Sequence, residues 1–310
     1  MVDFEEYAKS TYKWHPGHEK ELRITKSSLT SDFDFCPKQY EYKRIDGRKS
    51  AQTDDMLRGT NIHDAMEIYF INVKPVVSKI KVLATEGKDE EAFSLMMKCL
   101  PEPDEPYTLD EDPIIQTRME WEYARLLATD ETHYLPIMNE EEVHTHYIKT
   151  VEVNGETYEV PIHLAGMIDR GFLTEEDKVA IMELKTGKWR EGDSYKVRSM
   201  RTEMAFYAVL LKKADHPYKD VTHWGWLFPG GDRTGADRTI KHWDYEKINK
   251  RYFTSIDKRI DNLIEAYVLD NFPPVPSQGK CAWCDFMDEC PAWQEGGDHH
   301  WKNIKGRHKK

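Results

Sequence analysis

The 310-residue sequence lacks both a long hydrophobic run and the cysteine density of a disulfide-stabilised protein. No apolar segment is long enough to cross a bilayer, and the first residues, MVDFEEYAKS, lack the pattern of a signal peptide. Five cysteines in a chain of this size do not suggest a secreted disulfide framework, and clustered cysteines in a reducing compartment more often bind metal. We therefore expect no membrane association and a cytoplasmic location, in the host cell if a virus encodes the protein.

A surplus of positive charge is also missing, because the formal net charge is −12. This balance argues against a general polyanion-binding protein, whose phosphate contacts come from Lys and Arg. Residues 185–201 are an exception, with six Lys or Arg against two acids, and the last ten residues hold five Lys or Arg and no acid. No GxxxxGK[ST] motif is present, so ATP-driven unwinding of a nucleic acid would need a partner protein.

The stretch from residue 166 to residue 188 carries the main chemical signal. It predicts two strands joined by an acidic turn: the first ends at Asp169, and the second carries Glu183 and Lys185. Side chains alternate along a strand, so Glu183 and Lys185 share a face, which Asp169 reaches if the strands pair. Two carboxylates can hold Mg²⁺ or Mn²⁺ beside a phosphate, and a neighbouring lysine can orient or help deprotonate a water. The pattern indicates phosphodiester hydrolysis, although a lone D…ExK also arises by chance on exposed strands.

Helices are predicted on both sides of this stretch. Cys36-Pro37 interrupts a helical pattern over residues 29–44, because proline disfavours a helix interior. His63 lies at the edge of an apolar helical stripe, where a histidine is more often a buried core residue than a ligand. The helix predicted over residues 199–213 carries Glu203 and Tyr207 on one face, at i and i+4. A further helix is expected over about 245–268.

Three of the five cysteines follow a C-x2-C-x5-C pattern: Cys281, Cys284 and Cys290. Three thiolates need a fourth ligand, and Cys36 is the natural one, since a proline follows it as one follows Cys290, a pairing familiar at iron–sulfur sites. Structural zinc also accepts four cysteines, and His299 or His300 could then replace Cys36. Such a metal would join distant parts of the chain, so the fold should depend on it.

Together these motifs resemble the RecB-like exonucleases of the PD-(D/E)xK superfamily. Within it, the sequence is most similar to the iron–sulfur branch, which includes CRISPR-associated exonucleases and the nuclease modules of recombination helicases. The resemblance extends from Ser27 to Pro291, with residues 71–135 as a poorly matched insertion. The family's Gly-x-x-x-His corresponds to Gly59 to His63, its aspartate to Asp169, and its Glu-x-Lys to Glu183 and Lys185.

The resemblance implies a role for each matched residue. It implies three metal ligands, His63, Asp169 and Glu183, with Lys185 as the catalytic lysine. It implies that a [4Fe–4S] cluster is held by four cysteines: Cys36, Cys281, Cys284 and Cys290. The family's Gln-x-x-x-Tyr is represented by Glu203 and Tyr207, which complete the candidate catalytic set. The glutamate departs from the family pattern and adds negative charge facing a phosphate backbone.

We therefore expect one α/β nuclease domain over residues 1–296 with a restriction-endonuclease-like core, a mixed sheet flanked by helices. The helical insertion would occupy residues 71–135, the cluster would join residue 36 to residues 281–290, and residues 297–310 would form a basic tail. The expected activity is a Mg²⁺- or Mn²⁺-dependent DNA exonuclease acting on single-stranded ends. Trp189, Tyr195 and the 185–201 stretch would track the strand by stacking and charge.

A helicase or a CRISPR integrase is the kind of protein partner that this expectation suggests. The alternative hypothesis is a non-catalytic nucleic-acid-binding or assembly protein that keeps the nuclease fold and has a metal-stapled C-terminal segment. Divalent-metal binding at Asp169 and Glu183 separates the two hypotheses, because a pure scaffold should bind no Mn²⁺ there.

Overall fold

The structure is a computed structural model of the whole chain, and it places most of the residues. Described here are residues 21–50, 53–102, 111–189, 194–230, 241–242, 246–248 and 250–293. The expected basic tail, residues 297–310, lies outside these ranges. None of the described helices is both long and apolar enough to cross a membrane.

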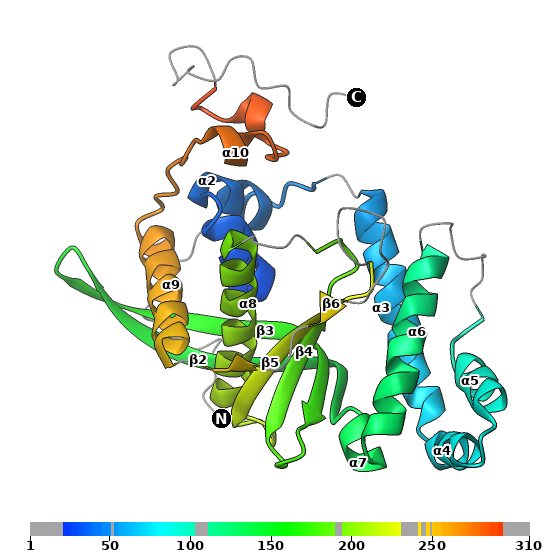
Figure 1. Cartoon of the computed structure of the whole chain (residues 1–310). Coiled ribbons are helices and arrows are strands. Elements are labelled where there is room, and N and C mark those ends of the chain that lie inside the picture. Colours follow the sequence, from blue (N-terminus) through cyan, green and yellow to red (C-terminus); the bar gives the residue numbers. More distant parts are fainter. Residues whose placement is uncertain are drawn as a thin grey trace.

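A mixed seven-stranded sheet lies at the centre of the molecule (Figure 1). Its strands are β1 (Leu22–Thr25), β2 (Met138–Val153), β3 (Glu156–Leu173), β4 (Val179–Leu184), β5 (Val221–Phe228), β6 (Lys241–His242) and β7 (Glu246–Lys247). The order is β1-β3-β4-β5-β6, with β2 paired to β3 and β7 paired to β5. The β1–β3 and β4–β5 pairs are parallel and the others are antiparallel, which confirms the predicted mixed α/β sheet.

The long β2–β3 hairpin turns at Asn154-Gly155. Both residues have left-handed backbones, with φ values of 54° and 81°. A two-residue turn of this kind matches the twist of the two strands, and asparagine and glycine tolerate its positive φ angles. The turn fixes the register, so Val153 pairs with Glu156 and the ladder continues back to Met138 opposite Gly171.

The other edge of β3 is shared by two strands. Because β2 pairs along one edge, β1 and β4 must both pair along the opposite one. β1 runs parallel to β3 and ends opposite Ala165, whereas β4 runs antiparallel and its ladder with β3 stops opposite Arg170. The two strands therefore meet end to end, and residues 166–169 of β3 lie between their ends. The candidate site forms in this interval.

Helices cover both faces of the sheet (Figure 1). One face packs against α8 (Ser194–Lys213) and α9 (Lys250–Val268), in a core that includes Ile162, Leu164 and Trp224. A second core covers part of the other face, where Phe172, Met182 and Leu184 pack with α3 and the following helices. These helices are α3 (Asp54–Val73), α4 (Val77–Thr85), α5 (Asp89–Met97), α6 (Glu111–Ala128) and α7 (Glu131–Tyr134). The helices expected as an insertion thus contribute to a core that includes sheet residues.

Short helices join the two ends of the described chain. They are η1 (Ser28–Phe33), α2 (Pro37–Tyr40), η2 (Glu41–Ile45), α10 (Gln278–Cys281) and η3 (Met287–Glu289). Pro37 occupies the first turn of α2, so the Cys36-Pro37 pair begins a helix instead of continuing one. The helix expected from about residue 245 begins at Lys250, because residues 246–247 pair with β5 as β7. That part of the prediction was wrong, since strand pairing overrode the helical pattern.

Candidate functional site

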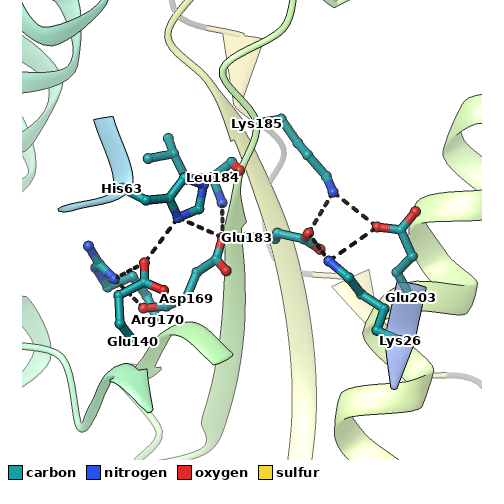
Figure 2. Close-up of polar contacts among 9 residues, drawn as sticks. All are labelled: Lys26, His63, Glu140, Asp169, Arg170, Glu183, Leu184, Lys185 and Glu203. Carbon is teal, nitrogen blue, oxygen red and sulfur yellow. Dashed lines mark hydrogen bonds and ion pairs between the residues drawn. The ribbon is translucent and has the colours of Figure 1, made fainter. Parts of the chain in front are cut away.

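Charged side chains from four strands and two helices, or from residues directly after them, converge where β1 and β4 meet on β3 (Figure 2). Asp169 comes from β3, Glu183 from β4 and Lys185 from just beyond its end. Lys26 directly follows β1, and Glu203 lies on α8. On the other side of Asp169, His63 of α3 and Glu140 of β2 complete the group.

The close approach of α8 to β3 depends on Gly166. A Cβ atom at this position would lie 3.0 Å from Leu210 Cδ2 and 3.2 Å from Tyr207 Cε1, which is tighter than most side-chain contacts. Tyr207 is 5% exposed, and the Lys26 ammonium lies 5.2 Å from the centroid of its ring. Because Glu203 is one helical turn before Tyr207, the same approach places its carboxylate over the site.

Two lysines share one oxygen of Glu183. The Nζ atoms of Lys26 and Lys185 each donate to Glu183 Oε1 at 2.5 Å. Glu203 Oε2 accepts from Lys185 at 3.0 Å and lies 3.7 Å from Lys26 Nζ. The second oxygen, Glu183 Oε2, is buried and has no hydrogen-bond partner among the residues that the structure places. A buried carboxylate oxygen without a partner is costly, so it fits a position that a ligand meets.

The charges keep this half of the site ionised. Burial acts to raise the pKa of Glu183, but Lys185 and Lys26 outweigh it and lower that pKa to about 2. Burial acts to lower the pKa of Lys185, but Glu183 outweighs it, with help from Glu203, and the pKa is raised. Lys185 is therefore an ammonium in the metal-free protein. It acts as a donor that can orient a water or neutralise charge on a phosphate, and not as a ready base.

His63 joins two carboxylates in the other half of the site. Its Nδ1 lies 3.0 Å from Glu140 Oε1 and 3.7 Å from Asp169 Oδ2, and its Nε2 lies 3.2 Å from the Leu184 carbonyl oxygen. Asp169 Oδ2 accepts the Leu184 N–H at 2.9 Å, and Arg170 donates to Glu140 Oε1 at 2.8 Å. One donor atom each from His63, Glu140 and Asp169 lies within 4.8 Å of the others, a group that could hold a metal ion.

The pKa shifts in this half indicate that positive charge stabilises the group of carboxylates around His63. Burial raises the pKa of Asp169 to about 6, with His63 opposing the shift and Glu183 and Glu140 adding to it. Burial acts to lower the pKa of His63, but its hydrogen bond to Glu140 and the charge of Asp169 outweigh it and raise that pKa. A proton on His63 thus supplies positive charge to the buried carboxylate of Asp169 and the partly buried carboxylate of Glu140 in the metal-free protein. A divalent cation supplies the same need more fully.

All six residues predicted for the nuclease site lie in this region: His63, Asp169, Glu183, Lys185, Glu203 and Tyr207. Among the described residues, however, the group of mutually close ligand atoms contains Glu140 and not Glu183. Two residues of the site, Glu140 and Lys26, were not predicted from the sequence. Glu140 could have been predicted from the hairpin turn, because counting back from Asn154-Gly155 places it opposite Asp169. No local signal marks Lys26.

The proposed stacking role of Trp189 is wrong. Its side chain is only 6% exposed, and its ring packs against Phe228 with the centroids 5.4 Å apart. A buried indole cannot receive a nucleic-acid base without leaving the core. The side chain of Tyr195 lies outside the part of the chain that the structure describes.

The four cysteines predicted to share a metal line one pocket: Cys36, Cys281, Cys284 and Cys290. They are free thiols, and the Val275 N–H donates to Cys36 Sγ at 3.4 Å. Burial, with a contribution from the neighbouring thiols, raises the pKa of Cys284 to about 11. No three of these sulfurs lie within 4.8 Å of one another in the described residues. The thiols thus face one pocket, but they are more widely spaced than ligands of a single ion.

Contacts beside the pocket hold the two chain segments together. The Tyr42 hydroxyl donates to the Glu289 carbonyl oxygen at 3.3 Å, and the Tyr42 and Phe286 rings meet with their centroids 5.4 Å apart. The Arg48 guanidinium lies over the Tyr42 ring, 4.0 Å from its centroid, and pairs with the Glu289 carboxylate. Figure 1 shows the result, with α10 directly above α2.

Comparison with known proteins identifies the family. The sequence matches the model of the PD-(D/E)XK nuclease superfamily over residues 26–291. No curated protein matches the chain. Among solved structures it is similar to SSO0001 (11% identity, 94% of this chain and 93% of that chain, TM-score 0.39). It is also similar to Scheffersomyces stipitis Rai1 in complex with (3'-NADP)+ and calcium ion (16% identity, 88% and 68% of the chains, TM-score 0.25). These structural similarities are too weak to bear on function. The family match covers most of the sequence, and the chain belongs to the PD-(D/E)XK nuclease superfamily.

Proposed function

We propose that this protein is a Mn²⁺- or Mg²⁺-dependent deoxyribonuclease of the RecB-like branch that degrades DNA from single-stranded ends. The observation that carries the proposal is the position of Glu183. One of its oxygens is fixed by Lys26 and Lys185, and the other is buried without a partner among the described residues, beside the His63 and Asp169 group. This combination suits a cation that bridges protein carboxylates and a phosphate.

The metal ligands would be His63, Glu140, Asp169 and Glu183. Nitrogen from His63 makes Mn²⁺ a better fit than Mg²⁺, which prefers an all-oxygen set. The bound ion would polarise the phosphate and stabilise the leaving oxygen. Glu140 belongs to this ligand set together with the three residues predicted from the sequence, because its carboxylate contacts His63.

Lys185 would position the attacking water. Its ammonium has three N–H donors, and Glu183 and Glu203 accept two of them. The third is left to donate to a water or to a phosphate oxygen. Glu203 thereby orients the lysine, a role that a glutamine oxygen could also fill. Burial, together with Glu183 and Asp169, raises the pKa of Tyr207 well above its usual value, so its hydroxyl stays protonated as a donor.

The test is incubation of the full chain with Mn²⁺ and end-labelled linear single-stranded DNA, with a circle of the same sequence as the matched control. We expect the linear DNA to be degraded from its ends, the circle to persist, and EDTA to stop the reaction. Equal cutting of the circle would show an endonuclease instead. No cleavage together with no Mn²⁺ binding would favour the non-catalytic nucleic-acid-binding alternative.

We also propose that the pocket of four cysteines holds a [4Fe–4S] cluster and that the nuclease domain spans residues 1–296. Four thiolates around one zinc ion, each about 2.3 Å from the metal, would lie about 4 Å apart. A cluster binds each thiolate through a different iron, so its four sulfur ligands lie further apart than the ligands of one zinc ion. The absence of three mutually close sulfurs among the described residues therefore favours a cluster over a single zinc ion. The cluster would bridge the segment at Cys36 and the segment from Cys281 to Cys290.

Replacing Cys284 by serine is expected to remove iron from the protein purified without oxygen, from about four atoms per chain to nearly none. The melting temperature should fall with it, because the link between the two segments is lost. Cys99→Ser is the matched control, since Cys99 is buried among the helices on the other face and should leave the iron content intact. Iron and visible absorbance measure the outcome. One zinc per chain and no iron in the wild type would contradict the cluster.

Lys26 offsets the extra negative charge of Glu203, so Glu203→Gln should strengthen DNA binding. Glu203 Oε2 lies 3.0 Å from Lys185 Nζ and 3.7 Å from Lys26 Nζ, so it would also lie near a phosphate held by these lysines. Removing a negative charge about 4 Å from such a phosphate changes the interaction by about 1 kcal/mol, or about fivefold in affinity. Fluorescence anisotropy with labelled single-stranded DNA, in Ca²⁺ to prevent cleavage, measures it. The double variant Lys26→Gln/Glu203→Gln restores the original net charge and should bind like the wild type. Weaker binding by the single variant would contradict this account.

A further inference from the structure

Three histidines of the β2–β3 hairpin gather beside a glutamate that precedes β1, outside the nuclease site. His146 and His163 pair directly across the hairpin, and their rings stack with the centroids 4.3 Å apart. Nδ1 of His144, two residues along the same face, lies 3.0 Å from His163 Nε2. Glu21, just before β1, places its carboxylate oxygens 2.9 and 3.1 Å from His146 Nδ1. One donor atom each from Glu21, His146 and His163 lies within 4.8 Å of the other two.

Strand alternation places this cluster on the face opposite α8 and α9. Val143 and Tyr147 of β2 pack with the core beneath those helices. Successive side chains of a strand point to opposite faces, so His144 and His146 share the face opposite to that of Val143 and Tyr147. Their side chains are 39% and 43% exposed, which leaves the cluster accessible from solution in the described part of the chain.

A chain of hydrogen bonds can fix the tautomer of His163. His144 Nε2 lies 3.2 Å from Glu142 Oε1, so it can donate a proton to that carboxylate. His144 Nδ1 can then accept the Nε2–H of His163. This arrangement leaves Nδ1 of His163 with a free lone pair. Histidines that bind metals commonly donate their other N–H to an outer acceptor in this way.

Two imidazole nitrogens and one carboxylate oxygen are a ligand set that zinc accepts, with a fourth position left for water. The set has more nitrogen than the nuclease site, where carboxylates predominate, so the two sites should prefer different metals.

We propose that Glu21, His146 and His163 bind a Zn²⁺ ion, with His144 orienting His163. The ion fastens the start of β1 to the β2–β3 hairpin. β1 pairs with the edge of β3 that continues into the nuclease site. The zinc site nevertheless does not depend on nuclease activity. The proposal stands or falls on metal binding alone.

A substitution at Arg23 should strengthen zinc binding, whereas deletion of a ligand should weaken it. It pairs with His163 in the sheet, and its positive charge acts on that histidine. A nearby guanidinium opposes a bound cation, so Arg23→Gln should lower the zinc dissociation constant. The expected change is about fivefold, the effect of one charge at short range in a solvated environment.

The experiment is equilibrium dialysis of the full chain against Zn²⁺ with metal counted per chain. His146→Gln/His163→Gln should hold one zinc fewer than the wild type. His216→Gln is the matched control, because among the described residues His216 forms an ion pair with a single carboxylate, that of Glu141, and the substitution should leave the count unchanged. Zinc should raise the melting temperature of the wild type and the control, but not that of the double variant at this site.

Two results would overturn the proposal: equal zinc counts in the wild type and the double variant, or no change in zinc affinity in Arg23→Gln. If the double variant fails to fold, His146→Gln alone decides. Its zinc dissociation constant should rise by more than the roughly 10- to 100-fold that loss of an outer-shell partner costs. An unchanged constant in that single variant would exclude the site.

Discussion

Replacing Lys185 by alanine is expected to lower the rate of DNA cleavage by about 10²- to 10⁴-fold, the usual effect of losing a group that positions or transfers a proton. The third N–H of Lys185 is the donor left for water or phosphate, and alanine cannot supply it. DNA binding should change little. Lys26 remains 2.5 Å from Glu183 Oε1 and keeps that carboxylate paired, so the site should stay folded. Single-turnover cleavage and anisotropy, measured separately, distinguish rate from binding.

The matched control for this variant is Lys212→Ala, which removes one exposed lysine from the last turn of α8. It has the same change in charge, and it should cleave DNA at the wild-type rate. Cleavage by Lys185→Ala at nearly the wild-type rate would contradict the proposed mechanism. A loss of binding equal to the loss of rate would assign Lys185 to substrate affinity instead of catalysis.

Asp169→Asn is expected to separate stability from function. In metal-free protein at pH 7 the variant should be more stable than the wild type, by about 1 to 3 kcal/mol, because the buried carboxylate is costly to keep ionised. The asparagine oxygen can still accept the Leu184 N–H that Asp169 Oδ2 accepts. With saturating Mn²⁺ the order should reverse, since only the wild type gains stability from binding the ion. The variant should also lose cleavage.

The stability difference between Asp169→Asn and the wild type should depend on pH. The pKa of Asp169 is about 6 in the folded protein, above the value of about 3.9 in an unfolded chain. The folded state therefore binds the proton more tightly, and this contribution to stability is complete below about pH 4 and is lost as the pH rises through about 6. The advantage of Asp169→Asn over the wild type should accordingly shrink on acidification from pH 7 to pH 4.

Urea unfolding in EDTA at several pH values measures this difference, and repeating it with Mn²⁺ measures the reversal. Asp177→Asn is the control, because its side chain is 81% exposed and the substitution should alter stability little under either condition. A metal-free Asp169→Asn protein that is less stable than the wild type at pH 7 would contradict the raised pKa. Equal stabilisation of both proteins by Mn²⁺ would remove Asp169 from the ligand set.

The sequence alone determined the features that depend on neighbours along the chain. Asn154-Gly155 set the turn and register of the hairpin, because only a few residues accept its left-handed backbone. Strand alternation set the shared face of Glu183 and Lys185, which the structure shows in ion contact. The order and spacing of the charged motifs then indicated the nuclease superfamily to which the chain belongs.

Only the tertiary structure decided which other groups enter the site. Lys26 reaches Glu183 because β1 and β4 meet end to end on one edge of β3, and no local pattern records that two strands share an edge. Trp189 is buried against Phe228, since a neighbouring strand end covers it, whereas its position in a basic stretch suggested exposure. Local geometry follows from residues a few places apart, but burial and the pairing of charges depend on segments brought together by the fold.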